Sequence, residues 1–306
     1  MHIILANPRG FCAGVNMALK ALTAALERFG TPMYVYHEIV HNTWVVEDFR
    51  QRGVVFVDDI DAVPSGSRLL FSAHGVAPSV RRTATERNIC TIDATCPLVA
   101  RVHREVIRFA SERRTIIMIG HREHDEVIGI VGEAPEYVRV VENVQEIDAL
   151  SVVPDERVVY LTKTTLSLNE THALVKYLRT KFPRIIGPPQ GDICYATQNR
   201  QRAIEKLAVG ADIVLVIGSR NSSNSRRLAE RAESLGICSY LVDGPDDIAA
   251  GWFSGGETVL VTAGASAPEH IVQKCVTVLQ SRFRSTLEEQ TVCEERIEFG
   301  LPKELA

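Results

Sequence analysis

Short apolar runs alternate along this sequence with longer segments of helical periodicity, and this alternation constrains the fold more than any other feature. The runs are rich in Val, Ile and Leu, as are the strands of a parallel sheet that is covered on both faces. Strands that alternate with helices predict an α/β protein with mainly parallel sheets. The predicted strands cover residues 2–7, 33–37, 68–74, 91–95, 115–121, 158–164, 212–219, 239–243 and 258–266.

The ends of these predicted strands are the first place to look for function. Nearly all of them stop in small or polar residues that could reach a ligand. In open α/β sheets, ligands bind in the crevice at the carboxyl ends of the strands. We therefore expect the functional residues in the loops that follow the strands.

Three cysteines share one local setting. Cys12 follows the first predicted strand, Cys96 follows "TIDAT", and Cys194 ends a loop rich in Pro and Gly. Each of them precedes apolar residues at helical spacing, and Pro97 suits the first position of the second helix. The cysteines divide the chain into segments of comparable length, which predicts three similar α/β lobes. We place these lobes at residues 1–96, 97–193 and 194–306, the last with a C-terminal arm after Arg284.

The position before a helix affects the ionisation of these thiols. A helix N-terminus stabilises negative charge, so a cysteine there is readily a thiolate, the metal-binding form. If three lobes close around a centre, three thiolates converge there. A cluster of four irons and four sulfides held by three thiolates has one iron with no protein ligand, as a catalytic zinc site has an open position.

The alternative is that each cysteine is a small buried hydrophobic residue, the commoner role of an intracellular cysteine. That role suits Cys90 and Cys238, which lie in strand-like segments, and Cys275, on the apolar face of a C-terminal helix. Cys293, in the tail, indicates nothing.

Several histidines lie after predicted strands. His41 and His74 occur in "EIVHN" and "FSAHG", and His121, His124 and Glu126 occur in "IGHREHDE". A single histidine is more often structural than catalytic, but placement at strand ends favours a site. The segment "GHREHDE" is also compatible with a zinc-dependent hydrolase, although two histidines three residues apart are a weak signal.

Two loops offer donors to an anion. They are "GSRNSSNS", with Ser222, Ser223 and Asn224, and "GASAPE", with Ser266. Backbone N–H groups and hydroxyls in such loops bind anions, although Ser and Asn also serve as ordinary helix N-caps. Neither loop is a Walker A motif, and no G-x-G-x-x-G follows a strand, so a small phosphorylated ligand is favoured over a nucleotide.

Composition excludes other classes of protein. A net charge of -4 argues against bulk nucleic-acid binding, because phosphate backbones attract clustered positive charge. Seven cysteines are an odd number, and the N-terminus does not read as a secretory signal, so a disulfide framework is not expected. No apolar run approaches the ~18 residues that a membrane span requires. We expect a cytoplasmic protein with neither a membrane nor a nucleic-acid partner.

The motifs, taken in order, resemble those of one known family. They are "RGFCAGV", "EIVHN", "FSAHG", "DATCPLV", "IGHREHDEV", "TKTTLS", "DICYATQNRQ", "GSRNSSNS" and "TAGASAPE". The family is 4-hydroxy-3-methylbut-2-enyl diphosphate reductase, which acts last in the non-mevalonate isoprenoid pathway. The resemblance covers almost the whole chain, with no departure at a functional position.

The resemblance implies a three-lobed α/β fold around one central 4Fe-4S cluster per chain. By motif, Cys12, Cys96 and Cys194 resemble the cluster ligands. The residues that resemble the substrate's diphosphate pocket are His41, His74, Ser222, Ser223, Asn224 and Ser266. His124 resembles a residue that lines the substrate cavity, Glu126 the residue that delivers a proton, and Thr164 its hydroxyl neighbour.

The implied reaction is the reductive dehydroxylation of (E)-4-hydroxy-3-methylbut-2-enyl diphosphate to isopentenyl and dimethylallyl diphosphate. Hydroxide is a poor leaving group, so the substrate oxygen is expected at the open iron while Glu126 supplies a proton, directly or through Thr164 and a water. The sequence has no flavin or nicotinamide motif, so two electrons must come from outside. The resemblance implies a flavodoxin or ferredoxin as donor.

Two other functions stay open on the residues alone. A zinc-dependent phosphohydrolase would use His121, His124 and Asp125 and would keep its activity without Cys12. An iron-sulfur redox sensor would use the three cysteines but would need neither Glu126 nor the anion-binding loops.

Overall fold

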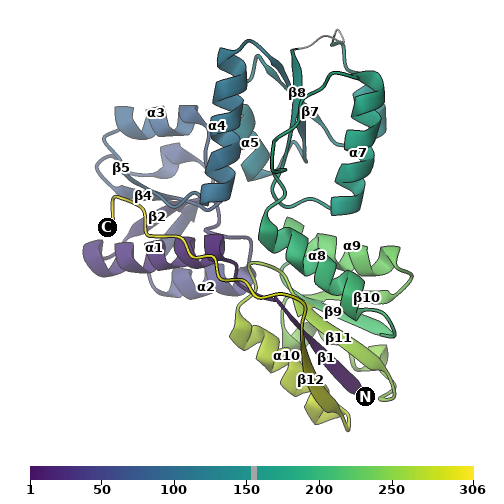
Figure 1. Ribbon diagram of the computed structural model, residues 1–306. Coiled ribbons are helices and arrows are strands. Elements are labelled where there is room, and N and C mark those ends of the chain that lie inside the picture. Colours follow the sequence, from purple (N-terminus) through teal and green to yellow (C-terminus); the bar gives the residue numbers. More distant parts are fainter. Residues whose placement is uncertain (153–156) are drawn as a thin grey trace. The chain divides into compact units, whose positions relative to one another are not determined.

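A computed structural model describes residues 1–152 and 157–306 of the protein (Figure 1). The strands in these residues form three sheets, and all their pairings are parallel. The predicted α/β class with parallel sheets is therefore confirmed. The chain groups into two units, one of residues 1–16, 40–49 and 195–298 and one of residues 17–39, 50–194 and 299–306. The lobe boundaries drawn from the cysteine spacing stay a prediction.

The first unit contains a sheet with the strand order β10-β9-β11-β1-β12. Its strands are β1 (His2–Asn7), β9 (Ile213–Ile217), β10 (Cys238–Val242), β11 (Thr258–Ala263) and β12 (Thr286–Thr291). Its other elements are α8 (Tyr195–Leu207), α9 (Ser223–Ser234), α10 (Glu269–Arg282), η2 (Pro245–Asp247) and η3 (Ala250–Trp252). Because the strands are parallel, the loops after β1, β9 and β11 all leave the sheet at the end where the carboxyl ends of the strands lie.

Both faces of this sheet are buried, which explains its continuous apolar runs. Ile3 and Leu5 of β1 pack in the cluster that includes the apolar side of α10. Ile4 and Ala6, which point to the opposite face, pack with residues of α8 and α9. Successive side chains of a strand alternate between faces, so a strand covered on both sides has no polar alternation.

The second unit contains two sheets. One has the order β3-β2-β4-β5, and the other has the order β7-β6-β8. The strands are β2 (Met33–Tyr36), β3 (Val54–Val57), β4 (Arg68–Phe71), β5 (Cys90–Asp93), β6 (Thr115–Ile119), β7 (Val138–Val141) and β8 (Val158–Thr162). The elements that lie wholly in this unit are η1 (Ile60–Ala62), α3 (Pro78–Glu86), α4 (Pro97–Ser111), α5 (Asp125–Val131), α6 (Val144–Asp148) and α7 (Leu168–Lys181). Helices α1 (Ala13–Phe29) and α2 (Thr43–Gln51) have residues in both units.

All the predicted strands form, and three others were missed. The missed strands are β3, β7 and β12, and each lies at the edge of its sheet. β3 and β7 have only four residues each and are only partly buried; β3 is apolar throughout (VVFV), whereas Arg139 interrupts the apolar run of β7 (VRVV). β12 has the mostly exposed sequence TLEEQT and pairs with β1 residue for residue. The first part of the predicted C-terminal arm is therefore an edge strand.

The helices carry one further finding. Among those in the described part of the chain, none is long and apolar enough to cross a lipid bilayer.

Candidate active site

Each of the three predicted cluster cysteines stands immediately before a helix, which confirms their common setting. Cys12 precedes α1, Cys96 is the N-cap residue of α4, and Cys194 precedes α8. All three residues are partly exposed, and none of the seven cysteines of the chain forms a disulfide bond. A thiolate at any of these positions meets the positive end of a helix dipole.

The backbone of each of these cysteines is fixed by a carbonyl group from a loop that follows another strand. The acceptors are Ala265 for the amide of Cys12 (3.1 Å), Ala73 for that of Cys96 (3.0 Å) and Thr164 for that of Cys194 (3.0 Å). These bonds hold the three loops in place at the Cα atoms from which the thiols project.

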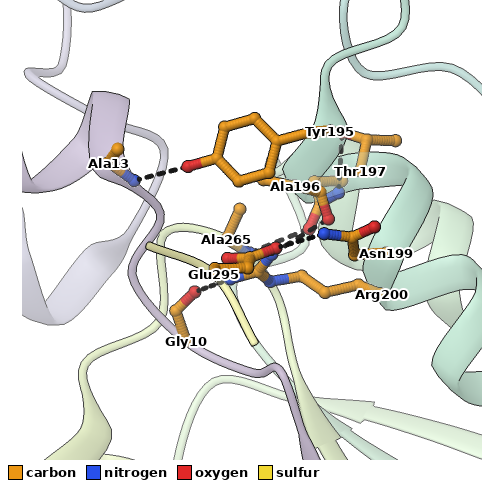
Figure 2. A network of polar contacts seen from close by, with 10 residues as sticks. Gly10, Ala13, Tyr195, Ala196, Thr197, Asn199, Arg200, Ala265 and Glu295 are labelled. Carbon is orange, nitrogen blue, oxygen red and sulfur yellow. Dashed lines mark hydrogen bonds and ion pairs between the residues drawn. The ribbon is translucent and has the colours of Figure 1, made fainter. Parts of the chain in front are cut away.

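The donor set fits an iron-sulfur cluster with three protein ligands. Thiolates are the ligands that such clusters take, and helix N-termini favour the thiolate form. A hydrogen bond also joins the segments that follow Cys194 and Cys12. The hydroxyl of Tyr195 accepts a hydrogen bond from the amide of Ala13 at 3.2 Å (Figure 2). The residues that directly follow Cys194 and Cys12 are thus bonded to each other.

Three other cysteines were predicted to be buried structural residues. Cys275 in α10 is fully buried, and burial raises the pKa of its thiol to about 12, which disfavours the thiolate. The prediction of a buried structural residue is therefore confirmed for Cys275. It is wrong for Cys90 and Cys238, which are exposed. Both are the first residues of edge strands, β5 and β10, where a sheet leaves side chains uncovered.

The serine-rich loop after β9 is both an N-cap and a source of donors. Ser222 is the N-cap of α9, and its Oγ accepts bonds from the amide of Ser225 (3.3 Å) and from the hydroxyl of Ser225 (3.0 Å). The hydroxyl of Ser266 lies 3.5 Å from the same oxygen, and its one hydrogen goes to the carbonyl of His41 at 2.9 Å. The two bonds from Ser225 fill both lone pairs of the Ser222 oxygen, so Ser222 can act only as a donor, to the Oγ of Ser266 or to an anion.

Two glycines make this arrangement of Ser225 feasible. A Cβ atom at Gly218 would lie 2.2 Å from the Oγ of Ser225, and one at Gly264 would lie 2.0 Å from it. Any larger residue at either position would displace Ser225 and, through it, the hydroxyl of Ser222.

The amide of Asn224 has a fixed orientation. Its Oδ1 accepts from the backbone N–H of Ala265 at 2.8 Å, and its Nδ2 donates to the Oγ1 of Thr197 at 3.1 Å. An Asn amide has two N–H donors, so one is left for a ligand. Ser222, Ser223, Asn224 and Ser266 are all buried. Their uncharged donors suit an anion that is held by hydrogen bonds.

The backbone around His41 is bonded to the loops at the carboxyl ends of the strands in the same sheet. The carbonyl of His41 accepts from the hydroxyl of Ser266 at 2.9 Å. The amide of Thr43 donates to the Oγ of Ser219 at 3.0 Å, and the indole N–H of Trp44 donates to the carbonyl of Asp243 at 2.8 Å. Loops after β9, β10 and β11 therefore hold the segment that carries His41.

In the second unit, Glu126 and Thr164 form a buried pair. Glu126 is 2% exposed and lies in the first turn of α5. Its Oε1 accepts from the amide of Thr164 at 2.7 Å, and its Oε2 accepts from the hydroxyl of Thr164 at 3.0 Å. A backbone amide can only donate, so a proton on Glu126 resides on Oε2 and faces the hydroxyl.

The pKa of Glu126 is raised above its ordinary value. The main cause is burial, which penalises the charged carboxylate. The positive charge of Lys163, the two bonds from Thr164 and the charge of His103 act in the opposite direction and are outweighed. Glu126 therefore keeps its proton to a higher pH than an exposed glutamate, as a proton donor requires.

Two charged residues near this pair escaped the sequence analysis. Lys163 is fully buried at the end of β8. Burial also raises the pKa of Asp192 to about 6, although its Oδ2 accepts from the amide of Thr162 at 2.9 Å. The guanidinium of Arg101, 3.5 Å from Oδ1, lowers this pKa but does not offset the burial. The available signal was position, since Lys163 directly precedes Thr164 and Asp192 lies two residues before Cys194.

His124 and His74 lie near each other. His124 is the N-cap of α5, and its Nδ1 accepts from the amide of Glu126 at 3.2 Å. A neutral His124 therefore carries its hydrogen on Nε2 and presents a donor there. The ring of His74 meets that of His124 edge to face, with 5.8 Å between ring centroids.

The residues of the zinc alternative do not form a metal site. Among the described residues, His121, His124 and Asp125 do not bring three ligand atoms within 4.8 Å of one another. The Nδ1 of His124 is instead used as a helix cap.

The chain is similar to known proteins along almost its whole length. The model of the family described as LytB protein matches residues 3–280. The chain belongs to the LytB family. A LytB-family relative from Rhodopirellula baltica, named 4-hydroxy-3-methylbut-2-enyl diphosphate reductase, is 53% identical over 305 residues, which cover 100% of this chain and 96% of the relative. The protein of the same name from Acinetobacter baylyi is 49% identical, with 100% and 98% covered.

A solved structure supports the same LytB assignment. The E-1-hydroxy-2-methyl-but-2-enyl-4-diphosphate reductase from Plasmodium falciparum superimposes with a TM-score of 0.97 at 38% identity and covers 99% of this chain and 96% of that one. These relatives are reductases, so this LytB protein is an enzyme, as the sequence predicted. The resemblance drawn from the motifs is confirmed.

Proposed function

We propose that this LytB protein reduces (E)-4-hydroxy-3-methylbut-2-enyl diphosphate to isopentenyl diphosphate and dimethylallyl diphosphate. Its relatives bear the name of that activity over the full length of the chain. A solved reductase of the same name, described as the terminal enzyme of the non-mevalonate pathway, has a TM-score of 0.66 at 29% identity. We assign this protein to the same step.

The proposed cofactor is one 4Fe-4S cluster per chain, held by Cys12, Cys96 and Cys194. What supports this assignment is the common setting of the three cysteines, each before a helix and each with its amide bonded to a carbonyl. When bound, the cluster supplies redox and Lewis-acid chemistry at an iron that has no protein ligand.

The reaction balances with two electrons and two protons. The allylic C–O bond breaks, the oxygen leaves as water, and the carbon skeleton is reduced. One proton goes to the leaving oxygen. The second adds at one end or the other of the allylic unit, which gives the two isomeric products.

Glu126 is the proposed source of the proton for the leaving oxygen. Its raised pKa keeps it protonated to a higher pH than an exposed glutamate, and the fixed amide donor on Oε1 places that proton on Oε2. The hydroxyl of Thr164, 3.0 Å from Oε2, can pass the proton on by taking one from Glu126 and releasing its own. The role of His124 is to line the cavity and to hold the first turn of α5 through its cap.

The diphosphate is proposed to bind to the hydrogen-bond donors of His, Ser and Asn side chains. The residues are His41, His74, Ser222, Ser223, Asn224 and Ser266. What supports this is the fixed orientation of the Asn224 amide, the donor hydrogen of Ser222 and the bond from Ser266 to the backbone of His41.

The electrons are proposed to come from a flavodoxin or a ferredoxin, since no flavin or nicotinamide motif occurs in the sequence. We expect the enzyme to act in the cytoplasm.

The observation that carries the proposal is the identity of 53% to a curated reductase along the entire chain. The test is turnover by protein purified without oxygen, with a chemically reduced viologen as electron source. We expect both isomeric diphosphates by mass spectrometry, and none without the reductant.

Three results would overturn the proposal. Release of phosphate without reductant, unaffected by Cys12→Ser, would indicate the zinc-dependent hydrolase. A cluster that responds to oxygen but no turnover would indicate a redox sensor. Turnover that persists in the absence of iron would exclude the cluster from the reaction.

A further inference from the structure

Arg200 is a fully buried arginine that joins three segments of the first unit (Figure 2). It lies in α8, the helix that follows Cys194. Its Nη2 donates to the carbonyl of Gly10 at 2.7 Å, and its Nη1 donates to the carbonyl of Ala196 at 2.9 Å. Both nitrogens also bond to the carboxylate of Glu295, the shortest of these bonds being 3.0 Å from Nη1 to Oε1.

Glu295 belongs to the C-terminal arm, beyond the last strand. The arm leaves β12 through a bond from the amide of Val292 to the carbonyl of Asn7 at 2.8 Å. Asn199 of α8 donates a further bond to the Oε1 of Glu295 at 3.0 Å. The carboxylate of Glu295 is thus bound by two side chains of one helix, and its side chain is only 13% exposed.

These contacts surround Cys12. Two residues before it, the carbonyl of Gly10 accepts from Arg200; one residue after it, the amide of Ala13 donates to the hydroxyl of Tyr195. The amide of Cys12 itself donates to the carbonyl of Ala265. α8 therefore holds the loop on both sides of the cysteine.

The loop cannot easily hold this shape unaided. Gly10 has a φ of +63°, the left-handed region that favours glycine, and a Cβ atom there would lie 3.1 Å from the carbonyl oxygen of Ala267. The buried guanidinium in turn depends on Glu295, because a buried charge that loses its partner is strongly destabilised. The position of the Gly10 carbonyl is thus linked to a residue at the far end of the sequence.

We propose that Glu295 and Arg200 act as positioning residues that fix Cys12 for cluster binding, so that the C-terminal arm is part of the machinery that retains the cluster. This inference rests on the proposed role of Cys12 as a cluster ligand. Neither residue touches substrate in the proposal. Their effect passes through the carbonyl of Gly10.

The test compares two neighbouring glutamates. Glu295→Gln removes the charge that binds Arg200 and keeps the size of the side chain. Glu294→Gln removes the same charge one residue earlier, from an exposed side chain that pairs with Arg296. In protein purified without oxygen, we expect Glu295→Gln to lose its cluster absorbance to an added iron chelator about tenfold faster than the wild type. Glu294→Gln should match the wild type.

A second measurement separates positioning from general destabilisation. After removal of the cluster, the alkylation rate of Cys12 by iodoacetamide is compared with that of Cys96 in the same molecules by mass spectrometry. We expect Glu295→Gln to speed alkylation of Cys12 and to leave Cys96 unchanged. Equal acceleration at both cysteines would mean that the pair only stabilises the fold.

A paired apolar variant, Arg200→Met with Glu295→Met, sharpens the distinction. Replacing both members of a buried ion pair with apolar residues often restores stability, but methionine cannot donate to the carbonyl of Gly10. We expect the thermal midpoint of this variant to approach that of the wild type while its cluster loss stays fast. Cluster loss at the wild-type rate in either Glu295 variant would overturn the inference. A wild type that never binds a cluster would instead refute the proposed function, and the alkylation ratio would still test the positioning of Cys12.

Discussion

The pair of Glu126 and Thr164 gives the sharpest quantitative prediction. Thr164→Val removes the hydroxyl that donates to Oε2 of Glu126 at 3.0 Å and keeps the amide that donates to Oε1 at 2.7 Å. A hydrogen bond to a charged group contributes about 1.5–3 kcal/mol. The protonated carboxyl also loses its bond to the hydroxyl, worth about 0.5–1.5 kcal/mol, so the carboxylate loses more by about 1–1.5 kcal/mol, and the pKa of Glu126 should rise by about one unit.

The sign of the effect on catalysis follows from the role of Glu126 as an acid. Its pKa is already raised by burial, and the acid is active when protonated, so kcat/KM falls as pH rises through that pKa. In Thr164→Val this alkaline decline should move to higher pH by about one unit. The plateau at lower pH should fall, because the hydroxyl that passes the proton is gone.

The assay is a pH profile of kcat/KM without oxygen, and Thr164→Ser is the matched control. Serine keeps the hydroxyl, so its decline should stay at the wild-type pH. An alkaline decline in Thr164→Val that stays in place or moves to lower pH would refute the reasoning that the Thr164 hydroxyl stabilises the charged carboxylate of Glu126 more than the protonated form.

Substitutions at three residues of the second unit test its electrostatics and its proton delivery. Lys163→Met removes a charge that lowers the pKa of Glu126, so the alkaline decline of kcat/KM should move up by about one unit or more, whereas Lys163→Arg should leave it in place. Asp192 has a folded pKa of about 6, above its ordinary 3.8, so its ionisation destabilises the fold as pH rises through this window. The free energy of unfolding of Asp192→Asn, measured in urea, should therefore rise relative to that of the wild type by up to roughly 3 kcal/mol between low and neutral pH. The same difference between variant and wild type at both pH values would contradict this. Glu126→Gln should keep iron content and substrate binding but lose most turnover, and near-normal turnover would remove Glu126 from proton delivery.

Local patterns in the sequence predicted much of this site. The apolar runs located the buried strands, and the cysteines were correctly placed before helices because strand, loop and helix signals all lie within a few residues of each one. The N-cap role of Ser222 could be foreseen for the same reason. β12 could not, because its polar sequence is that of an exposed arm and only its pairing with β1 makes it a strand.

Pairs that are distant in the sequence mark the limit of this approach. Arg200 and Glu295 are 95 residues apart, and each looks in isolation like an ordinary surface charge. The same holds for Lys163 and its effect on Glu126, which depends on burial that no local pattern records. Charged side chains are rarely buried, so sequence reasoning places them at the surface by default.

Mössbauer spectroscopy tests the proposed site most directly. The measurement uses protein labelled with iron-57 and purified without oxygen, with and without (E)-4-hydroxy-3-methylbut-2-enyl diphosphate. If Cys12, Cys96 and Cys194 hold the cluster, one iron site should differ from three thiolate-bound sites, and only that site should shift when the diphosphate is added. Four equivalent iron sites whose Mössbauer signal does not change when the diphosphate is added, or zinc in place of iron, would contradict the proposal.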